Sequence, residues 1–190
     1  MSHRVCPWWL GYLLASPLRR LLQDPRKVLG PYVREGMTVL EPGPGMGFFT
    51  LELARLVGPT GRVLAVDIQP RMLDSLRRRA ARAGLLNRID IRLVSSGSMG
   101  LADLAGSVDF TPAIAIVHEL PNVERFFTEV AEVSKPGAGL LIAEPAGHIK
   151  QEHFESELQA AIRAGFVLEA RPSIRHCHAA LLTRCMPAEH

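Results

Sequence analysis

The stretch from Val39 to Thr50 reads VLEPGPGMGFFT and is the most informative part of the sequence. A short apolar run typical of a buried strand ends in a glutamate, passes into a glycine-rich turn and leads into a helical spacing of apolar residues. Gly43, Gly45 and Gly47 allow the backbone to turn tightly and to approach a ligand near the start of a helix. The stretch therefore predicts a strand, loop and helix with a ligand held against the loop.

Strand-like and helix-like segments alternate on the C-terminal side of this stretch. Such alternation is typical of a parallel sheet that is covered by helices on both faces. Strands are expected at residues 38–41, 63–67, 89–94, 108–117 and 140–144, and helices are expected to begin at Gly47, Pro70, Asn122 and about Gln151.

Two further strand-like runs, at residues 166–170 and about 178–183, close the chain. Only a short turn region around Pro172 and Ser173 separates them, so they should pair as an antiparallel hairpin. The expected fold is α/β: a doubly wound, mostly parallel sheet of seven strands that ends in an antiparallel hairpin.

Length and composition place the chain among ordinary globular domains. Its 190 residues are enough for one domain, and 47% hydrophobic with 22% charged residues is close to the globular average. This composition excludes a disordered chain, a collagen and a coiled coil. The three cysteines are too few for a disulfide scaffold, which favours a reducing compartment and predicts a cytoplasmic protein.

The N-terminal segment is interpreted as a helical lid over residues 1–32, followed by one globular unit over 33–190. Ser16-Pro17 and Asp24-Pro25 each place a capping side chain before a proline at the first helical position. The apolar run at residues 5–15 is shorter than the ~20 residues that span a bilayer, so no membrane span is expected.

The glycine spacing separates two classes of ligand. A dinucleotide fingerprint requires G-x-G-x-x-G or A, but the third position is Phe48 when counted from Gly43 and Thr50 when counted from Gly45. The motif E-P-G-P-G-M-G instead resembles the first motif of class I S-adenosylmethionine-dependent methyltransferases. Residues 61–73 (GRVLAVDIQPRML), 116–122 (IVHELPN) and 134–144 (SKPGAGLLIAE) are similar to later segments of the same family, so the resemblance covers about 33–183.

The resemblance implies a Rossmann-like fold with S-adenosylmethionine as cofactor. Asp67 matches the acid that holds the ribose hydroxyls, and a carboxylate can accept from both hydroxyls of a diol. Ser96 stands where the family often has an acid that contacts the adenine. The expected cofactor-binding residues are Glu41, Gly43, Pro44, Gly45, Gly47, Asp67, Ile68, Gln69, Ser96 and Gly97.

The candidate catalytic residues are His118 and Glu119, which follow the fourth strand. Ligands of open α/β sheets bind at the carboxyl ends of the strands, where a histidine can act as a general base. The competing interpretation is that His118 only hydrogen-bonds its loop and that Glu119 is a solvated acid of the same loop. Glu144 and His148 form a second polar pair after the fifth strand. In the fourth strand, Pro112 removes one ladder donor, which predicts either a bulge or an early start of the pocket there.

Other functions receive less support from the residues. His176, Cys177, His178 and Cys185 match no standard zinc spacing, so no metal is expected. The arginines of residues 70–83 surround a helix face away from its apolar stripe, which makes nucleic acid an unlikely substrate. A small-molecule acceptor is expected, with its identity and the oligomeric state left open. The alternatives are a non-catalytic S-adenosylmethionine-binding or interaction module and, third, a nicotinamide-dependent oxidoreductase.

Overall fold

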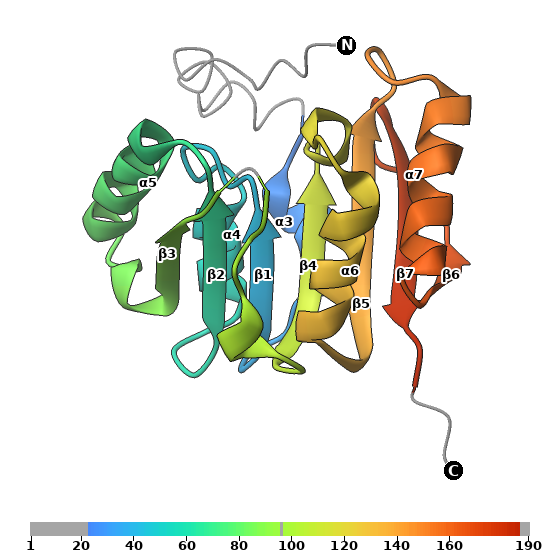
Figure 1. Cartoon of the computed structure of the whole chain (residues 1–190). Helices are drawn as coiled ribbons and strands as arrows, with labels where there is room; N and C mark the ends of the chain where they lie inside the picture. Colours follow the sequence, from blue (N-terminus) through green and yellow to red (C-terminus); the bar gives the residue numbers. More distant parts are fainter. Residues whose placement is uncertain (1–22, 96, 187–190) are drawn as a thin grey trace. The chain divides into compact units, whose positions relative to one another are not determined.

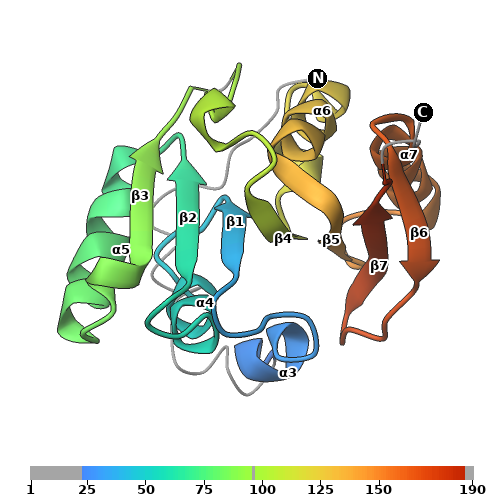
Figure 2. The same ribbon diagram turned by 90° about the horizontal axis from the view of Figure 1, so that it is seen from below.

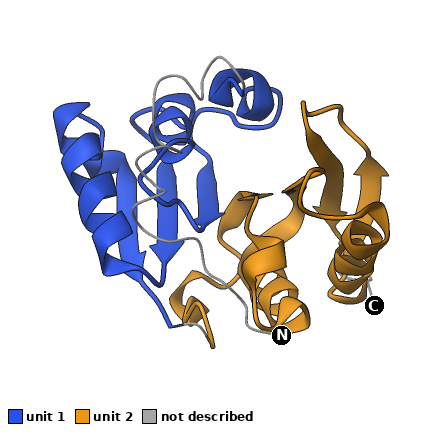
Figure 3. Cartoon of the chain, turned by 90° about the horizontal axis from the view of Figure 1, so that it is seen from above, with its two compact units in different colours: residues 1–95 blue, residues 96–190 orange. Residues whose placement is uncertain are grey.

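A computed structural model describes residues 23–95 and 97–186 of the chain. Strands and helices alternate along it (Figure 1). The chain divides into two compact units, Met1–Ser95 and Ser96–His190, which are coloured separately in Figure 3.

The strands of the first unit form a parallel array in the order β3-β2-β1 (Figure 2). They are β1 (Thr38–Pro42), β2 (Arg62–Asp67) and β3 (Ile89–Leu93). The middle strand β2 is buried from Val63 to Asp67, as expected for a strand with neighbours on both sides. Because Glu41 pairs with Ala65, the two carboxyl ends of β1 and β2 lie at the same edge of the array.

The helices of the first unit are α3 (Pro25–Leu29), α4 (Thr50–Leu56), α5 (Pro70–Arg82) and the 3-10 turn η1 (Leu86–Arg88). The predicted cap of α3 is confirmed, since the Asp24 side chain accepts from the Arg26 N–H at 3.0 Å. The helix α5 packs against β2 and β3 with Met72, Leu76 and Ala80 buried.

The prediction that a helix begins at Gly47 is wrong by three residues. Gly47 has a φ of +84°, which a right-handed helix cannot contain, and α4 begins only at Thr50.

The second unit holds four strands in the order β4-β5-β7-β6. The strands β4 and β5 are parallel, whereas β7 is antiparallel to both β5 and β6, which confirms the predicted C-terminal hairpin. The strands are β4 (Val108–Ile114), β5 (Ser134–Pro145), β6 (Phe166–Ala170) and β7 (Cys177–Arg184). The helices are η2 (Ala102–Leu104), η3 (Val117–Glu119), α6 (Val123–Val133) and α7 (Gln151–Arg163).

The bulge predicted at Pro112 is misplaced. Pro112 pairs in register with Leu141, and the irregularity lies earlier, between Val108 and Phe110. The Ala115 N–H donates to the Ala143 carbonyl of β5. Because the N–H groups of successive residues point to opposite sides of a strand, the backbone nitrogen of Pro112, three residues earlier, points away from β5. The proline therefore removes no hydrogen bond from the β4–β5 ladder.

The seven-stranded, mostly parallel sheet with an antiparallel end confirms the expected Rossmann-like fold class. Residues 1–22 of the predicted lid lie outside the described part of the chain, which begins just before α3. Over residues 23–95 and 97–186, no helix is long and apolar enough to cross a membrane.

Candidate cofactor and proton-transfer sites

The glycine loop of the first unit is tied to the end of β2 and takes left-handed conformations at Gly43, Gly45 and Gly47. The Gly43 N–H donates to the Val66 carbonyl at 2.9 Å, and the Gly47 N–H donates to the Pro44 carbonyl at 2.9 Å. Gly43 and Gly45 have φ values of +65° and +54°. A Cβ placed on Gly45 meets no atom of the described residues within 4 Å, so the described part of the chain leaves open space beside the loop backbone there. This is an exposed backbone surface of the kind that a ligand can approach.

Glu41, at the end of β1, is buried with one carboxylate oxygen unsatisfied. Its side chain is 4% exposed, and Oε2 has no hydrogen-bond partner among the described residues. The pKa of Glu41 is raised to about 8, with burial as the largest cause; the Thr50 hydroxyl lowers this pKa, and the negative charge of Asp67 raises it. A buried acceptor that lacks a donor is expected to receive one from a ligand.

Asp67 ends β2 and is almost as buried, at 8% exposed. The Gln69 N–H donates to its Oδ1 at 2.9 Å, which fixes the carboxylate at the turn into α5. Between them, Ile68 exposes 38% of its apolar side chain. The structure thus brings Glu41, Asp67 and the glycine loop to the same edge of the first unit.

Arg79 braces the glycine loop, which corrects the expectation that every arginine of this helix lies on its solvated face. From the third turn of α5, its guanidinium donates to the Met46 carbonyl. The sequence signal was available, because Arg79 lies three residues after the buried Leu76 and so borders the apolar stripe of the helix. Arg71, Arg77, Arg78 and Arg82 are exposed, as expected for a solvated helix face.

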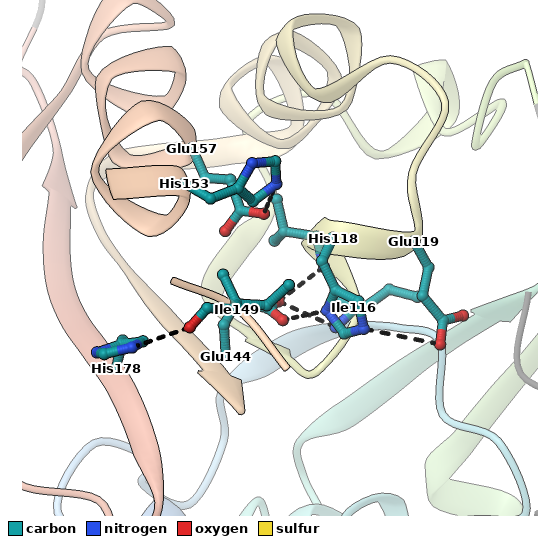
Figure 4. Close-up of polar contacts among 9 residues, drawn as sticks. Ile116, His118, Glu119, Glu144, Ile149, His153, Glu157 and His178 are labelled. Atoms are coloured by element: carbon teal, nitrogen blue, oxygen red, sulfur yellow. Dashed lines mark hydrogen bonds and ion pairs between the residues drawn. The ribbon is translucent and has the colours of Figure 1, made fainter. Parts of the chain in front are cut away.

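In the second unit, Glu144 organises a compact polar cluster (Figure 4). Its side chain is fully buried near the end of β5. One oxygen, Oε1, accepts from the N–H groups of Ile116 and Val117 at 3.1 and 2.8 Å, and the other, Oε2, bonds to His118 Nδ1. A buried carboxylate with three hydrogen bonds is well satisfied. Ala115, which has a left-handed φ of +53°, immediately precedes the two residues whose amides donate to Glu144.

The bond to Glu144 orients His118 and changes its acidity. It is the largest cause of a raised pKa of the His118 imidazole; burial lowers this pKa, and the charges of Glu144, Glu119 and Glu157 raise it. Because Nδ1 is bonded to Glu144, Nε2 is the nitrogen left to exchange a proton. Nε2 lies 4.0 Å from Glu119 Oε1. A histidine held by a buried carboxylate in this way can act as a general base.

Glu157 of α7 is a second residue that sequence reasoning missed. It is 2% exposed, and neither of its oxygens makes a hydrogen bond with the described residues. Burial and the charge of Glu144 raise the pKa of Glu157 to about 8, while His118 lowers it. Its position could have signalled this burial, since it lies three residues after Phe154 on the apolar stripe of the helix.

Some predicted residues are placed apart from these clusters. The expected Glu144–His148 pair is not formed, because Glu144 is buried against His118 whereas the His148 side chain is exposed beyond the end of β5. Gly97 is exposed, and Ser96 lies outside the described residues. The His178 ring lies 5.7 Å from the Phe154 ring, between centroids, and is tilted by 34° to it. The described residues contain no group of three or more side chains arranged to hold a metal ion.

The residues of the first unit fit S-adenosylmethionine. The unsatisfied Glu41 oxygen can accept from an ammonium group, the open loop backbone can approach a chain, and Asp67 can accept from a diol. A model of the family described as "Methyltransferase domain" matches residues 33–178. The chain belongs to this family. S-adenosylmethionine is therefore its cofactor, and the expected methyltransferase resemblance is confirmed.

Similar proteins support this methyltransferase domain at the level of the whole fold. A solved S-adenosylmethionine-dependent methyltransferase from Aquifex aeolicus is 27% identical with a TM-score of 0.84, covering 94% of this chain and 99% of that one. An arsenite methyltransferase from Halobacterium salinarum is 33% identical over 57% of this chain and 27% of its own length. The ubiquinone/menaquinone biosynthesis C-methyltransferase UbiE from Klebsiella pneumoniae is 33% identical over 59% of this chain and 44% of its own length. The chain thus matches less than half of these two curated relatives.

Proposed function

We propose that this methyltransferase domain transfers a methyl group from S-adenosylmethionine to a small-molecule acceptor and that His118 takes the proton the acceptor releases. The observation that carries the proposal is the buried, unsatisfied Oε2 of Glu41 beside the left-handed glycine loop. The names of the two curated relatives, one for arsenite and one for quinone biosynthesis, support a small acceptor.

Residues of the first unit are assigned to the cofactor. Glu41 accepts from its amino group, the backbone of Gly43, Pro44, Gly45 and Gly47 borders its chain, and Asp67 holds its ribose. Ile68 and Gln69 are proposed to lie next to the ribose, and Ser96 and Gly97, which begin the second unit, are proposed neighbours of the adenine. When bound, S-adenosylmethionine supplies an electrophilic methyl group on a sulfonium.

Residues of the second unit are assigned to the acceptor. His118 Nε2 receives the proton, while Glu144 holds Nδ1 and stabilises the imidazolium that forms. Glu119, 4.0 Å from Nε2, is proposed to orient the acceptor. Positioning supplies much of the acceleration of such a displacement, so no further catalytic side chain is required.

Calorimetric titration of the whole chain with S-adenosylmethionine, S-adenosylhomocysteine and NADH tests the cofactor assignment. We expect the first two to bind and NADH not to bind. Asp67→Asn keeps an oxygen for the Gln69 N–H but loses the charge, and charged hydrogen bonds contribute ~1.5–3 kcal/mol each, so affinity should fall at least about tenfold. Asp74→Asn, at an exposed position of α5, is the matched control. Equal affinity of the Asp67 variant and this control would refute the ribose assignment.

A further inference from the structure

The segment that follows β3 carries no acid of its own. It reads SSGSMG over residues 95–100, and it contains Ser96 and Gly97, the proposed neighbours of the adenine. Serine and glycine restrict a backbone little, so a loop of this composition needs bonds from another element to hold one conformation. The place of Gly97 beside a base therefore depends on what the next residues are bonded to.

Glu129 of α6 supplies such bonds from outside the loop. Its Oε2 accepts from the Met99 N–H at 2.7 Å, and the Ser98 hydroxyl also donates to its carboxylate. The same hydroxyl accepts from the Gly100 N–H at 3.1 Å. The other oxygen, Oε1, accepts from Arg125 Nε at 3.1 Å, one turn earlier on the helix. One carboxylate thus holds three consecutive loop residues, directly or through the Ser98 hydroxyl.

Glu129 makes these bonds in its charged form. Burial is the largest single influence and raises the pKa of Glu129, but the hydrogen bonds from Ser98, Met99 and Arg125, together with the Arg125 charge, outweigh it. The pKa is therefore lowered, and the side chain is ionised at neutral pH. Hydrogen bonds to an ionised group are roughly twice as strong as those between neutral groups.

The far end of the same segment is attached to α6 as well. The Gly106 N–H donates to the Glu132 carbonyl at 3.0 Å, and the Ser107 N–H donates to the Val133 carbonyl at 2.9 Å. Between the two attachments, η2 lies against α6. The second attachment comes well beyond Gly97 in the sequence, so the bonds at Ser98 and Met99 are the ones that constrain the residues proposed for the adenine.

We propose that Glu129 is a positioning residue for the cofactor: by holding Ser98 and Met99 on α6, it keeps Ser96 and Gly97 in place for the adenine before the cofactor binds. The inference rests on the proposed placement of the adenine. Glu129 acts through the loop and does not touch the base. A loop that is ordered in advance does not lose conformational entropy on binding, so the role of Glu129 appears as affinity for ligands that carry the adenine.

Titration of the full chain with S-adenosylhomocysteine and with S-ribosylhomocysteine, which lacks the adenine, separates this role from a structural one. In Glu129→Ala, the affinity for S-adenosylhomocysteine should fall about tenfold, whereas the affinity for S-ribosylhomocysteine should not change. Glu129→Gln keeps one oxygen for the Met99 N–H and should recover part of the loss. Glu132→Ala, at an exposed position three residues later on α6, removes the same charge and should change neither affinity.

Amide relaxation measured by NMR on the free chain gives a second readout. In the wild type, the order parameters of the Met99 and Gly100 amides should be near the rigid-backbone value of about 0.85. In Glu129→Ala they should fall below about 0.6, and saturation with S-adenosylhomocysteine should raise them again. Unchanged order parameters in the variant, or an equal loss of affinity for both ligands, would overturn the proposal. Where S-ribosylhomocysteine binds too weakly to titrate, the order parameters decide.

The inference and the proposed function fail in different ways. If the wild type binds S-adenosylhomocysteine and Glu129→Ala binds it equally well, the positioning role is rejected and methyl transfer is untouched. If the wild type does not bind S-adenosylhomocysteine, the proposed function is rejected, and the order parameters still show whether Glu129 holds the loop.

Discussion

Glu41 is subject to opposite demands from folding and from binding. Its burial without a full set of partners is unfavourable in the free protein, whereas the same unsatisfied oxygen is what a bound ammonium would use. The ionisable carboxyl group that binding requires should therefore lower the stability of the free protein. Removing its charge should raise that stability.

Replacing Glu41 by Gln should therefore stabilise the free protein and weaken cofactor binding. The folded-state pKa of about 8 lies above the ordinary value of 4.5, so the folded protein binds more protons than the unfolded chain between these pH values. Wild-type stability should fall as the pH rises from about 4.5 to 8, and Glu41→Gln should remove this contribution. At pH 7 the variant should gain about 1–3 kcal/mol of unfolding free energy.

Urea unfolding at pH 5, 7 and 8, followed by titration with S-adenosylhomocysteine, measures both effects. Glu35→Gln, at an exposed position before β1, is the charge control and should keep the pH dependence of the wild type. A Glu41→Gln variant that is no more stable than wild type at pH 7 would show that Glu41 is satisfied in the free protein.

At the scale of elements, the junction between the glycine loop and α5 determines where α4 begins. The left-handed Gly47 delays the helix to Thr50, and its missing side chain leaves room for Leu76 of α5. A Cβ added at Gly47 would lie 2.5 Å from Leu76 Cδ1. The same loop is held from α5 by the Arg79 bond to Met46.

Gly47→Ala should cost both backbone strain and packing. Gly84→Ala is the matched control, because Gly84 also has a positive φ of +67° but an added Cβ there has no atom of residues 23–95 or 97–186 within 4 Å. The control should lose about 1–2 kcal/mol from strain alone. Gly47→Ala should lose about 1 kcal/mol more and also bind the cofactor less tightly. If chemical denaturation shows equal losses of stability for the two variants, and cofactor affinity is unchanged, the contact with Leu76 contributes to neither stability nor binding.

At the scale of the whole molecule, the two units carry different parts of the proposed chemistry. The cofactor residues assigned within the described structure lie in the first unit, apart from Gly97, and the His118 cluster lies in the second. Amide hydrogen exchange, measured on the intact chain, reports the protection of both units in one experiment.

Adding S-adenosylhomocysteine should slow amide exchange most strongly in residues 38–47 and 67–70. At a hundredfold excess over the dissociation constant, amides that exchange only from the ligand-free form should slow by about 100-fold. The Asp67→Asn variant at the same ligand concentration should show weaker protection. Protection confined to the second unit would contradict the assignment of the cofactor to β1 and β2.

The sequence by itself determined the class of fold and the family. Glycine spacing, the acids that end two strands, and the alternation of strands with helices are local features, and local sequence constrains them directly. They identified Glu41 and Asp67, which the structure brings together at one edge, although their roles toward the cofactor stay predictions. Only the tertiary structure paired Glu144 with His118 and buried Glu157 beside them, because residues 26 and 39 positions apart from His118 meet through strand pairing and helix packing, for which a single sequence carries no distance information.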